Sequence, residues 1–181
     1  MTQVMLLESP TEIDWREVRR RAFITIYQKE AFIKSQDLAT GLEWRHKILE
    51  ARHSPIRYLK YAFLFKDIPS NIAVHLCRHV HAQPYVSSLR NDRQDAIDGD
   101  KARRDTPVNM ILDLNAEELM VIANKRLCAK ASEKTQEVVR MMCGLAEKAT
   151  PELAGLLVPM CEYHGGVCHE MKPCGRRDDK F

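Results

Sequence analysis

The chain lacks a long apolar segment. Its 181 residues contain no run that approaches the roughly 20 apolar residues needed to span a bilayer. The first residues, Met1 to Glu8, have neither the positively charged start nor the apolar stretch of a secretory signal peptide. We therefore expect a cytoplasmic protein with no membrane partner.

A strong excess of charge of one sign is also missing. Lysine and arginine number 28 against 25 acidic residues, which gives a formal net charge of +3. Proteins that bind nucleic acids by charge alone are usually far more basic. This balance disfavours nucleic acid as the partner and favours a small anionic ligand.

The chain has no internal repeat or low-complexity tract, and its length fits one domain with a hydrophobic core. Period-two alternation between Tyr58 and Asp67 predicts a strand with one apolar face, and further strands are expected at residues 3–7 and 108–114. Helical patterns cover four stretches: 14–26, 41–51, 69–82, and 115–148 with a break near Ser132. The order of elements predicts an α+β fold, and the charged run 91–105 predicts an exposed loop.

The segment from Arg78 to Arg90 concentrates two arginines, two histidines and two serines. Guanidinium groups bind phosphate through paired hydrogen bonds, and hydroxyl groups can complete an anion site. His75 and His79 also have the spacing of two metal ligands on a helix, but Arg78 between them would repel a cation. The segment therefore predicts a site for a phosphorylated ligand, and a solvated surface is the alternative.

Arg126 occupies an unusual position in the last predicted helix. It lies within the apolar stripe that includes Leu119, Ile122 and Leu127, and not on the polar face. A buried guanidinium without a partner costs several kcal/mol. We expect either an internal ion pair or a bound ligand to contact it.

The order of three segments resembles the flavin-dependent thymidylate synthases, the ThyX family. These segments are the predicted strand, the helix that ends in Leu76-Cys77-Arg78-His79, and Ser88-x-Arg90. Ser54-Pro55 matches an element that precedes them in the family. Asn115, Leu119, Arg126 and Ala131 match positions of its last long helix. The resemblance covers residues 45–145 and implies a small, mostly antiparallel sheet packed with long helices.

The resemblance also implies site residues. Ser54, Arg78 and His79 match contacts to FAD. Ser88, Arg90 and Arg126 match contacts to the phosphate and pyrimidine of dUMP, with Ser87 in the same turn. His75 takes a place near the nucleotide that the family usually fills with a glutamine, and it is the further expected substrate contact. In the implied reaction, FAD reduced by NADPH supplies hydride, methylenetetrahydrofolate supplies carbon, and Arg126 acts as the catalytic residue by polarising the uracil carbonyl. The family typically forms homotetramers whose active sites combine several subunits.

Several positions depart from the family pattern. Val80 replaces an arginine, Arg57 replaces a glutamate that contacts flavin, and Glu117 replaces another arginine. Gln83 and Asn91 also differ, and the connection from Arg90 to Asn115 is short. Two alternatives therefore stay open: a non-catalytic protein that binds pyrimidine nucleotides or supports assembly, and an enzyme that modifies a different pyrimidine nucleotide.

The C-terminal segment is rich in metal-binding residue types. We expect a main domain at 1–158 and a Cys/His-rich tail at 159–181. Cys161, His164, Cys168 and Cys174 predict a zinc site, with His169 as an alternative ligand and reduced free thiols as the alternative state. The tail also permits a third hypothesis, a small zinc-containing nucleic-acid binder that uses Arg103, Arg176 and Arg177.

Overall fold

The computed structural model describes residues 1–26 and 39–175, and its centre is a four-stranded antiparallel sheet. The strands are β1 (Gln3–Glu8), β2 (Lys60–Pro69), β3 (Gln83–Val86) and β4 (Pro107–Asn115), in the order β1-β2-β4-β3. The predicted α+β class and antiparallel sheet are therefore confirmed. Arg176 and Arg177, which the nucleic-acid hypothesis uses, lie outside the described residues.

The alternation in β2 and β4 creates the core. Tyr61, Phe63 and Phe65 are buried on one face of β2, and Phe63 pairs with Leu112 of β4, which is fully buried. Burial of aromatic side chains is a major source of stability in a domain of this size. One apolar face of the sheet therefore defines where the helices must pack.

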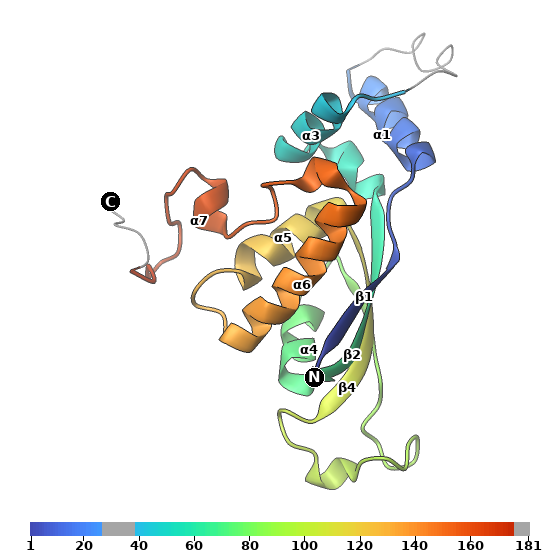
Figure 1. Ribbon diagram of the computed structural model, residues 1–181, viewed down its shortest axis with the longest axis vertical. Helices are drawn as coiled ribbons and strands as arrows, with labels where there is room; N and C mark the ends of the chain where they lie inside the picture. Colours follow the sequence, from blue (N-terminus) through green and yellow to red (C-terminus); the bar gives the residue numbers. More distant parts are fainter. Residues whose placement is uncertain (27–38, 176–181) are drawn as a thin grey trace.

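The helices lie on this face or at one end of the sheet (Figure 1). Helices α4 (Ser70–Cys77), α5 (Ala116–Arg126) and α6 (Glu133–Ala149) cover the face, whereas α1 (Glu12–Thr25) and α3 (Leu42–Glu50) lie at the end. The predicted break near Ser132 is confirmed, because the Ser132 side chain accepts a hydrogen bond from Thr135 N and begins α6. No helix in the described part of the chain is both long and apolar enough to cross a membrane.

The predicted extent of the helix after β2 was wrong. Helix α4 ends at Cys77 instead of Ala82, so His79 lies in the following turn. The chain then forms edge strand β3, in which Pro84 pairs with Leu112 and which the sequence did not predict. A four-residue strand that contains proline gives almost no alternation signal, and the residue before proline must leave the helical conformation. The turn between α4 and β3 therefore presents His79 to α5.

The remaining described elements are short. Three 3-10 helices, η1 (Ser54–Tyr58), η2 (Gly99–Lys101) and η3 (Pro151–Leu153), connect the larger elements, and α7 (Met160–Tyr163) belongs to the C-terminal segment. The 91–105 segment is mostly exposed, as predicted. Asn124 Nδ2 donates to Val158 O at 2.7 Å and thereby holds the start of the C-terminal segment against α5. The predicted boundary between 158 and 159 stays a prediction.

Candidate functional site

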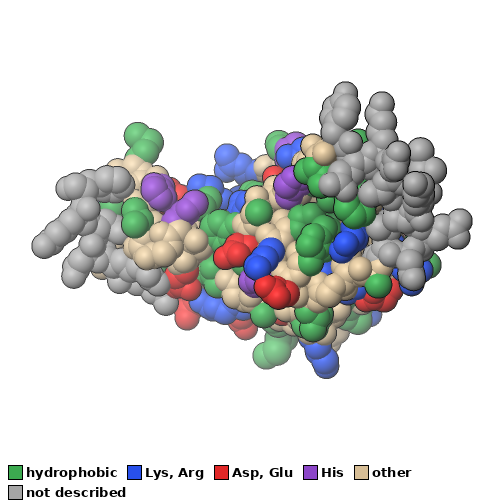
Figure 2. All heavy atoms as spheres, turned by 90° about the horizontal axis from the view of Figure 1, so that it is seen from above, with side chains coloured by type: hydrophobic (Ala, Val, Ile, Leu, Met, Phe, Trp, Pro, Cys, Tyr) green, Lys and Arg blue, Asp and Glu red, His purple; other side chains and the backbone are tan. Residues whose placement is uncertain are grey.

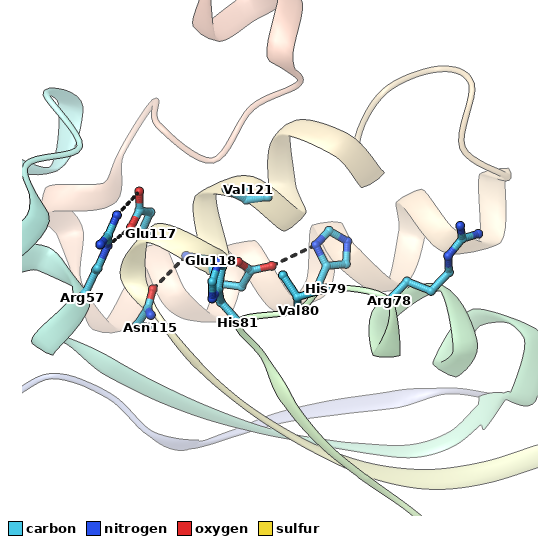
Figure 3. Close-up of a pocket in the computed structure, with 9 residues that line it drawn as sticks. All are labelled: Arg57, Arg78, His79, Val80, His81, Asn115, Glu117, Glu118 and Val121. Atoms are coloured by element: carbon cyan, nitrogen blue, oxygen red, sulfur yellow. Dashed lines mark hydrogen bonds and ion pairs between the residues drawn. The ribbon is translucent and has the colours of Figure 1, made fainter.

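The site lies where the turn after α4 meets the beginning of α5. A cavity of about 450 Å³ opens there, within the range typical of small-molecule sites. Figure 3 shows its lining, with Arg57 and Glu117 at one end and Arg78 at the other. The residues that line it come from η1, from the 78–81 turn, from the last residue of β4 and from α5: Arg57, Arg78, His79, Val80, His81, Asn115, Glu117, Glu118 and Val121.

Three side chains, Glu118, His79 and Arg126, form a hydrogen-bonded chain. Glu118 and His79 line the cavity, and Arg126 lies behind His79 and is not part of the lining. His79 Nδ1 lies 3.0 Å from Glu118 Oε1, and Arg126 Nε donates to His79 Nε2 at 3.1 Å. Arg126 Nη2 also donates to the carbonyl oxygen of His75 at 2.9 Å. The sequence predicted an internal ion pair or a bound ligand for Arg126, and the described residues form no such ion pair. In the described part of the chain its partners are a histidine and a backbone carbonyl, because no carboxylate pairs with Arg126 directly.

Burial changes the protonation of the chain. His79 and Glu118 are both buried, with side-chain exposures of 7% and 5%. Burial, and secondly the charge of Arg126, lower the pKa of His79 to about 4. Burial also raises the pKa of Glu118, and it lowers that of Arg126 with a smaller contribution from Arg78. His79 is therefore neutral at pH 7.

Arg57 and Glu117 form an ion pair at the cavity mouth, with Arg57 Nη2 donating to Glu117 Oε1 at 3.4 Å and a second bond from Nε. These are two of the positions at which the chain departs from the resembled family. Arg78, in contrast, is exposed on the opposite side of the cavity. Val80 is 81% exposed beside it. The cavity therefore offers one unshielded guanidinium to a ligand.

The other predicted residues lie away from this cavity. Ser87 continues the pairing of β3, since its backbone N donates to Asn109 O at 2.8 Å and its Oγ accepts from Asn109 N at 2.9 Å. Ser88 Oγ accepts from Arg90 N, and the Arg90 guanidinium makes a two-point ion pair with Asp92 at 2.9 and 2.7 Å. Ser54 is exposed at the start of η1, and His75 Nδ1 lies 3.4 Å from Thr135 Oγ1. Within one chain, His75, His79 and Arg126 meet, and the Ser87–Arg90 turn does not join them.

Glu118 is the site residue that the sequence interpretation missed. Asn115 and Glu118 have the spacing of a capping box, and the Asn115 side chain accepts from Glu118 N at 2.9 Å. The Glu118 carboxylate, however, turns to His79. A glutamate on the buried face of an otherwise apolar helix was the available signal, because such a group requires a partner.

The C-terminal cysteines gather around a second, small cavity of about 20 Å³. Cys161, Cys168 and Cys174 line it together with Cys128 from the α5–α6 connection, which the spacing argument did not include. The predicted ligand His164 instead contacts His169, with ring centroids 5.0 Å apart. Histidine side chains gather on this projecting segment in Figure 2 (left). No group of three or more His, Cys, Asp or Glu within residues 1–26 and 39–175 is arranged to hold a metal ion, so the zinc site stays a prediction.

Comparison with solved structures defines the fold. Thymidylate synthase ThyX from Helicobacter pylori, solved with FAD and dUMP, is 16% identical and superposes with a TM-score of 0.64 over 87% of this chain and 97% of that chain. The UMP/dUMP methylase PolB from Streptomyces cacaoi, bound to 5-Br dUMP, is 15% identical, with a TM-score of 0.66 over 84% and 92%. A second H. pylori ThyX complex with FAD and dUMP is 17% identical, with a TM-score of 0.59 over 81% and 99%.

The chain therefore has a ThyX-like fold, and the 78–81 turn and the beginning of α5 line a cavity on that scaffold. No family model and no curated protein matches the sequence. At identities of 15 to 17%, the structural likeness identifies the fold.

The donor set is compatible with a flavin nucleotide. Arg78 and Asn115 offer hydrogen bonds to phosphate or carbonyl oxygens at the cavity. The two acidic residues there are already engaged, Glu117 by Arg57 and Glu118 by His79. Arg57 compensates the negative charge of Glu117, whereas neutral His79 gives Glu118 a hydrogen bond and no compensating charge.

Proposed function

We propose that this protein is a flavin-dependent enzyme that methylates a pyrimidine mononucleotide, with dUMP as the expected substrate. The observation that carries this proposal is the contact of Arg126 with His79, a residue that lines the cavity of a ThyX-like fold. ThyX from Helicobacter pylori, which has this fold, was solved with FAD and dUMP in two structures.

Arg126 would bind the uracil carbonyl in this proposal. Its Nε and one Nη2 hydrogen are engaged by His79 and His75, while Nη1 has no hydrogen-bond partner among the described residues. A guanidinium held in this way can donate to a carbonyl oxygen and stabilise negative charge that develops on it. Neutral His79 adds no second positive charge, so Arg126 is the group that attracts the developing anion.

When bound, the flavin supplies hydride to the transferred carbon. Arg78 and His79 are the proposed contacts of this chain to the flavin. Ser54, at the start of η1, is the third proposed contact. The turn Ser87, Ser88 and Arg90 is the proposed phosphate contact. The net reaction converts methylenetetrahydrofolate, NADPH and one proton to tetrahydrofolate and NADP⁺, while a methyl group replaces the hydrogen on C5 of the pyrimidine.

The proposed active site needs more than one copy of the chain, since the Ser87–Arg90 turn and Arg126 do not line one cavity. One feature supports an oligomer, with a tetramer expected. On the sheet face away from the helices, Met5, Leu64, Ile111 and Tyr85 pair in register and form a continuous apolar row across all four strands. Tyr85 is 61% exposed in this row. Large exposed apolar patches commonly mark protein interfaces.

The cytoplasmic location stays a prediction.

A second candidate is an enzyme for another uridine nucleotide, which the likeness to a UMP/dUMP methylase supports. A third is a nucleotide-binding protein without turnover, and it is motivated by Val80 and Arg57 at positions where the resembled family uses different charges.

Turnover assays distinguish these candidates. The purified chain would be incubated with FAD, NADPH, methylenetetrahydrofolate and either dUMP or UMP, and the 5-methyl product measured by mass spectrometry. We expect methylation of dUMP. Product from UMP alone would favour the second candidate, and nucleotide binding without product would favour the third. An Arg126→Lys variant should lose most activity, because lysine keeps the charge but cannot contact His79, His75 and a carbonyl together.

A further inference from the structure

Glu118 lies at the start of a hydrogen-bonded chain whose far end is the proposed substrate contact. Glu118 and Arg126 belong to the two ends of α5, eight residues and about 12 Å of helix apart. His79, from the turn after α4, bridges them with bonds of 3.0 and 3.1 Å. A side chain from another element therefore connects the beginning of α5 to its end.

The chemistry of arginine fixes the direction of these hydrogen bonds. A guanidinium can only donate, so His79 Nε2 must accept from Arg126 Nε and must lack a proton. A neutral imidazole then carries its proton on Nδ1, which donates to Glu118 Oε1. The opposite tautomer would point an N–H at the guanidinium and leave Nδ1 beside a carboxylate without a hydrogen to share.

We propose that Glu118 is a positioning residue: it locks His79 in the Nδ1-protonated tautomer, so that Nε2 holds Arg126 with Nη1 directed toward a ligand carbonyl. The role in substrate recognition rests on the proposed function, whereas the tautomer lock is a property of the protein without ligand. Burial supports the lock, because neither partner of the His79–Glu118 bond can exchange it readily for water.

Two substitutions separate positioning from packing. In Glu118→Gln the amide oxygen can still accept from Nδ1, so the tautomer should be retained. In Glu118→Met the volume is similar but the acceptor is lost, so His79 should no longer be held in one tautomer. Lys125→Gln, on the same helix and engaged with Glu170, is the matched control.

Nitrogen-15 NMR of the ligand-free protein measures the lock. In wild type at pH 7 we expect the His79 Nε2 signal of an unprotonated nitrogen and slow exchange of the Arg126 Nε proton. Glu118→Gln and the control should keep both signals, and Glu118→Met should lose both. A protonated Nε2 in wild type, or unchanged signals in Glu118→Met, would overturn the proposal. If Glu118→Met does not fold, the wild-type and Glu118→Gln spectra still decide the tautomer.

Nucleotide titration then tests the link to recognition. We expect Glu118→Met to bind dUMP roughly tenfold more weakly than wild type, and Glu118→Gln to recover most of this loss. Equal affinity of Glu118→Met and wild type would contradict a positioning role. Absence of dUMP binding by wild type together with the expected NMR signals would instead contradict the proposed function and leave the lock itself established.

Discussion

Arg57 and Glu117, sixty residues apart in the sequence, pair across the mouth of the cavity that His79 lines. Each departs alone from the pattern of the resembled family, which has a glutamate and an arginine at these positions. Together they form a pair of opposite charges in which the positions of the acidic and the basic residue are exchanged relative to the family pattern. The two departures are therefore a single exchange of charges at the cavity mouth.

This pairing predicts a specific pattern of charge reversals. Arg57→Glu and Glu117→Arg each place like charges at the mouth, and we expect each to weaken binding of FAD or dUMP roughly tenfold. The double reversal restores a pair and should recover most of the wild-type affinity. Titration by calorimetry measures all four proteins. Additive losses in the double variant would show that the two residues act independently.

The protonation of His79 gives a second prediction. Because its pKa in the folded protein is about 4, below the ordinary value near 6.5, the imidazole should stay neutral at pH 6 and titrate near pH 4. NMR titration of the His79 ring measures this directly. A midpoint at 6 or above would contradict the buried chain with Glu118 and Arg126.

The free energy of unfolding should depend on pH because the pKa of His79 differs between the folded and the unfolded chain. Below pH 6.5 the unfolded chain binds a proton at His79 that the folded chain does not, so this contribution to the free energy of unfolding decreases as the pH falls from about 6.5 to 4. The full shift in the pKa of His79 corresponds to about 3 kcal/mol of unfolding free energy. Glu118, whose pKa is raised, offsets part of it by taking up a proton in the folded state. Denaturation of His79→Gln should therefore depend less on pH in this range than that of wild type.

Val80 provides a gain-of-function test. It is 81% exposed at the cavity, so Val80→Arg should change the free energy of unfolding by no more than about 0.5 kcal/mol. The new guanidinium would stand beside Arg78 where the resembled family has an arginine, and we expect FAD to bind roughly tenfold more tightly. Val74→Arg, at an exposed position of α4, controls for general charge. Equal effects of the two substitutions would indicate nonspecific attraction.

The strands and helices with strong periodicity could be predicted from the sequence, and the short or locally unusual elements could not. The alternation around Phe63 determined β2, and Ser132 determined the break between α5 and α6. Strand β3 forms because it pairs with β4, and the sequence of Gln83–Val86 contains no local pattern that predicts this pairing. The same limit applies to the site: the apolar stripe revealed that Arg126 needs a partner, but only the tertiary contact shows that His79 supplies it.

The zinc site predicted from the cysteine-rich segment differs most from what the described residues show. Composition predicts about one zinc atom per chain, and the shared cavity adds Cys128 as a candidate ligand. Elemental analysis of protein purified without chelator, together with thiol titration, checks the metal. Protein free of metal with four or more titratable thiols would contradict it. Cys128→Ser should lower a real metal content more than Cys77→Ser, since Cys77 lies in α4 outside that cavity.

The absorbance spectrum of the purified protein, recorded before and after addition of FAD and then dUMP, tests the central claim most directly. We expect flavin bands either as purified or on addition of FAD, and a further spectral change when dUMP enters the same site. Arg126→Lys should reduce the dUMP response and keep the flavin bands. A protein that shows no flavin bands after dialysis with excess FAD and no response to dUMP would contradict the account of this chain as a flavin-dependent enzyme for pyrimidine nucleotides.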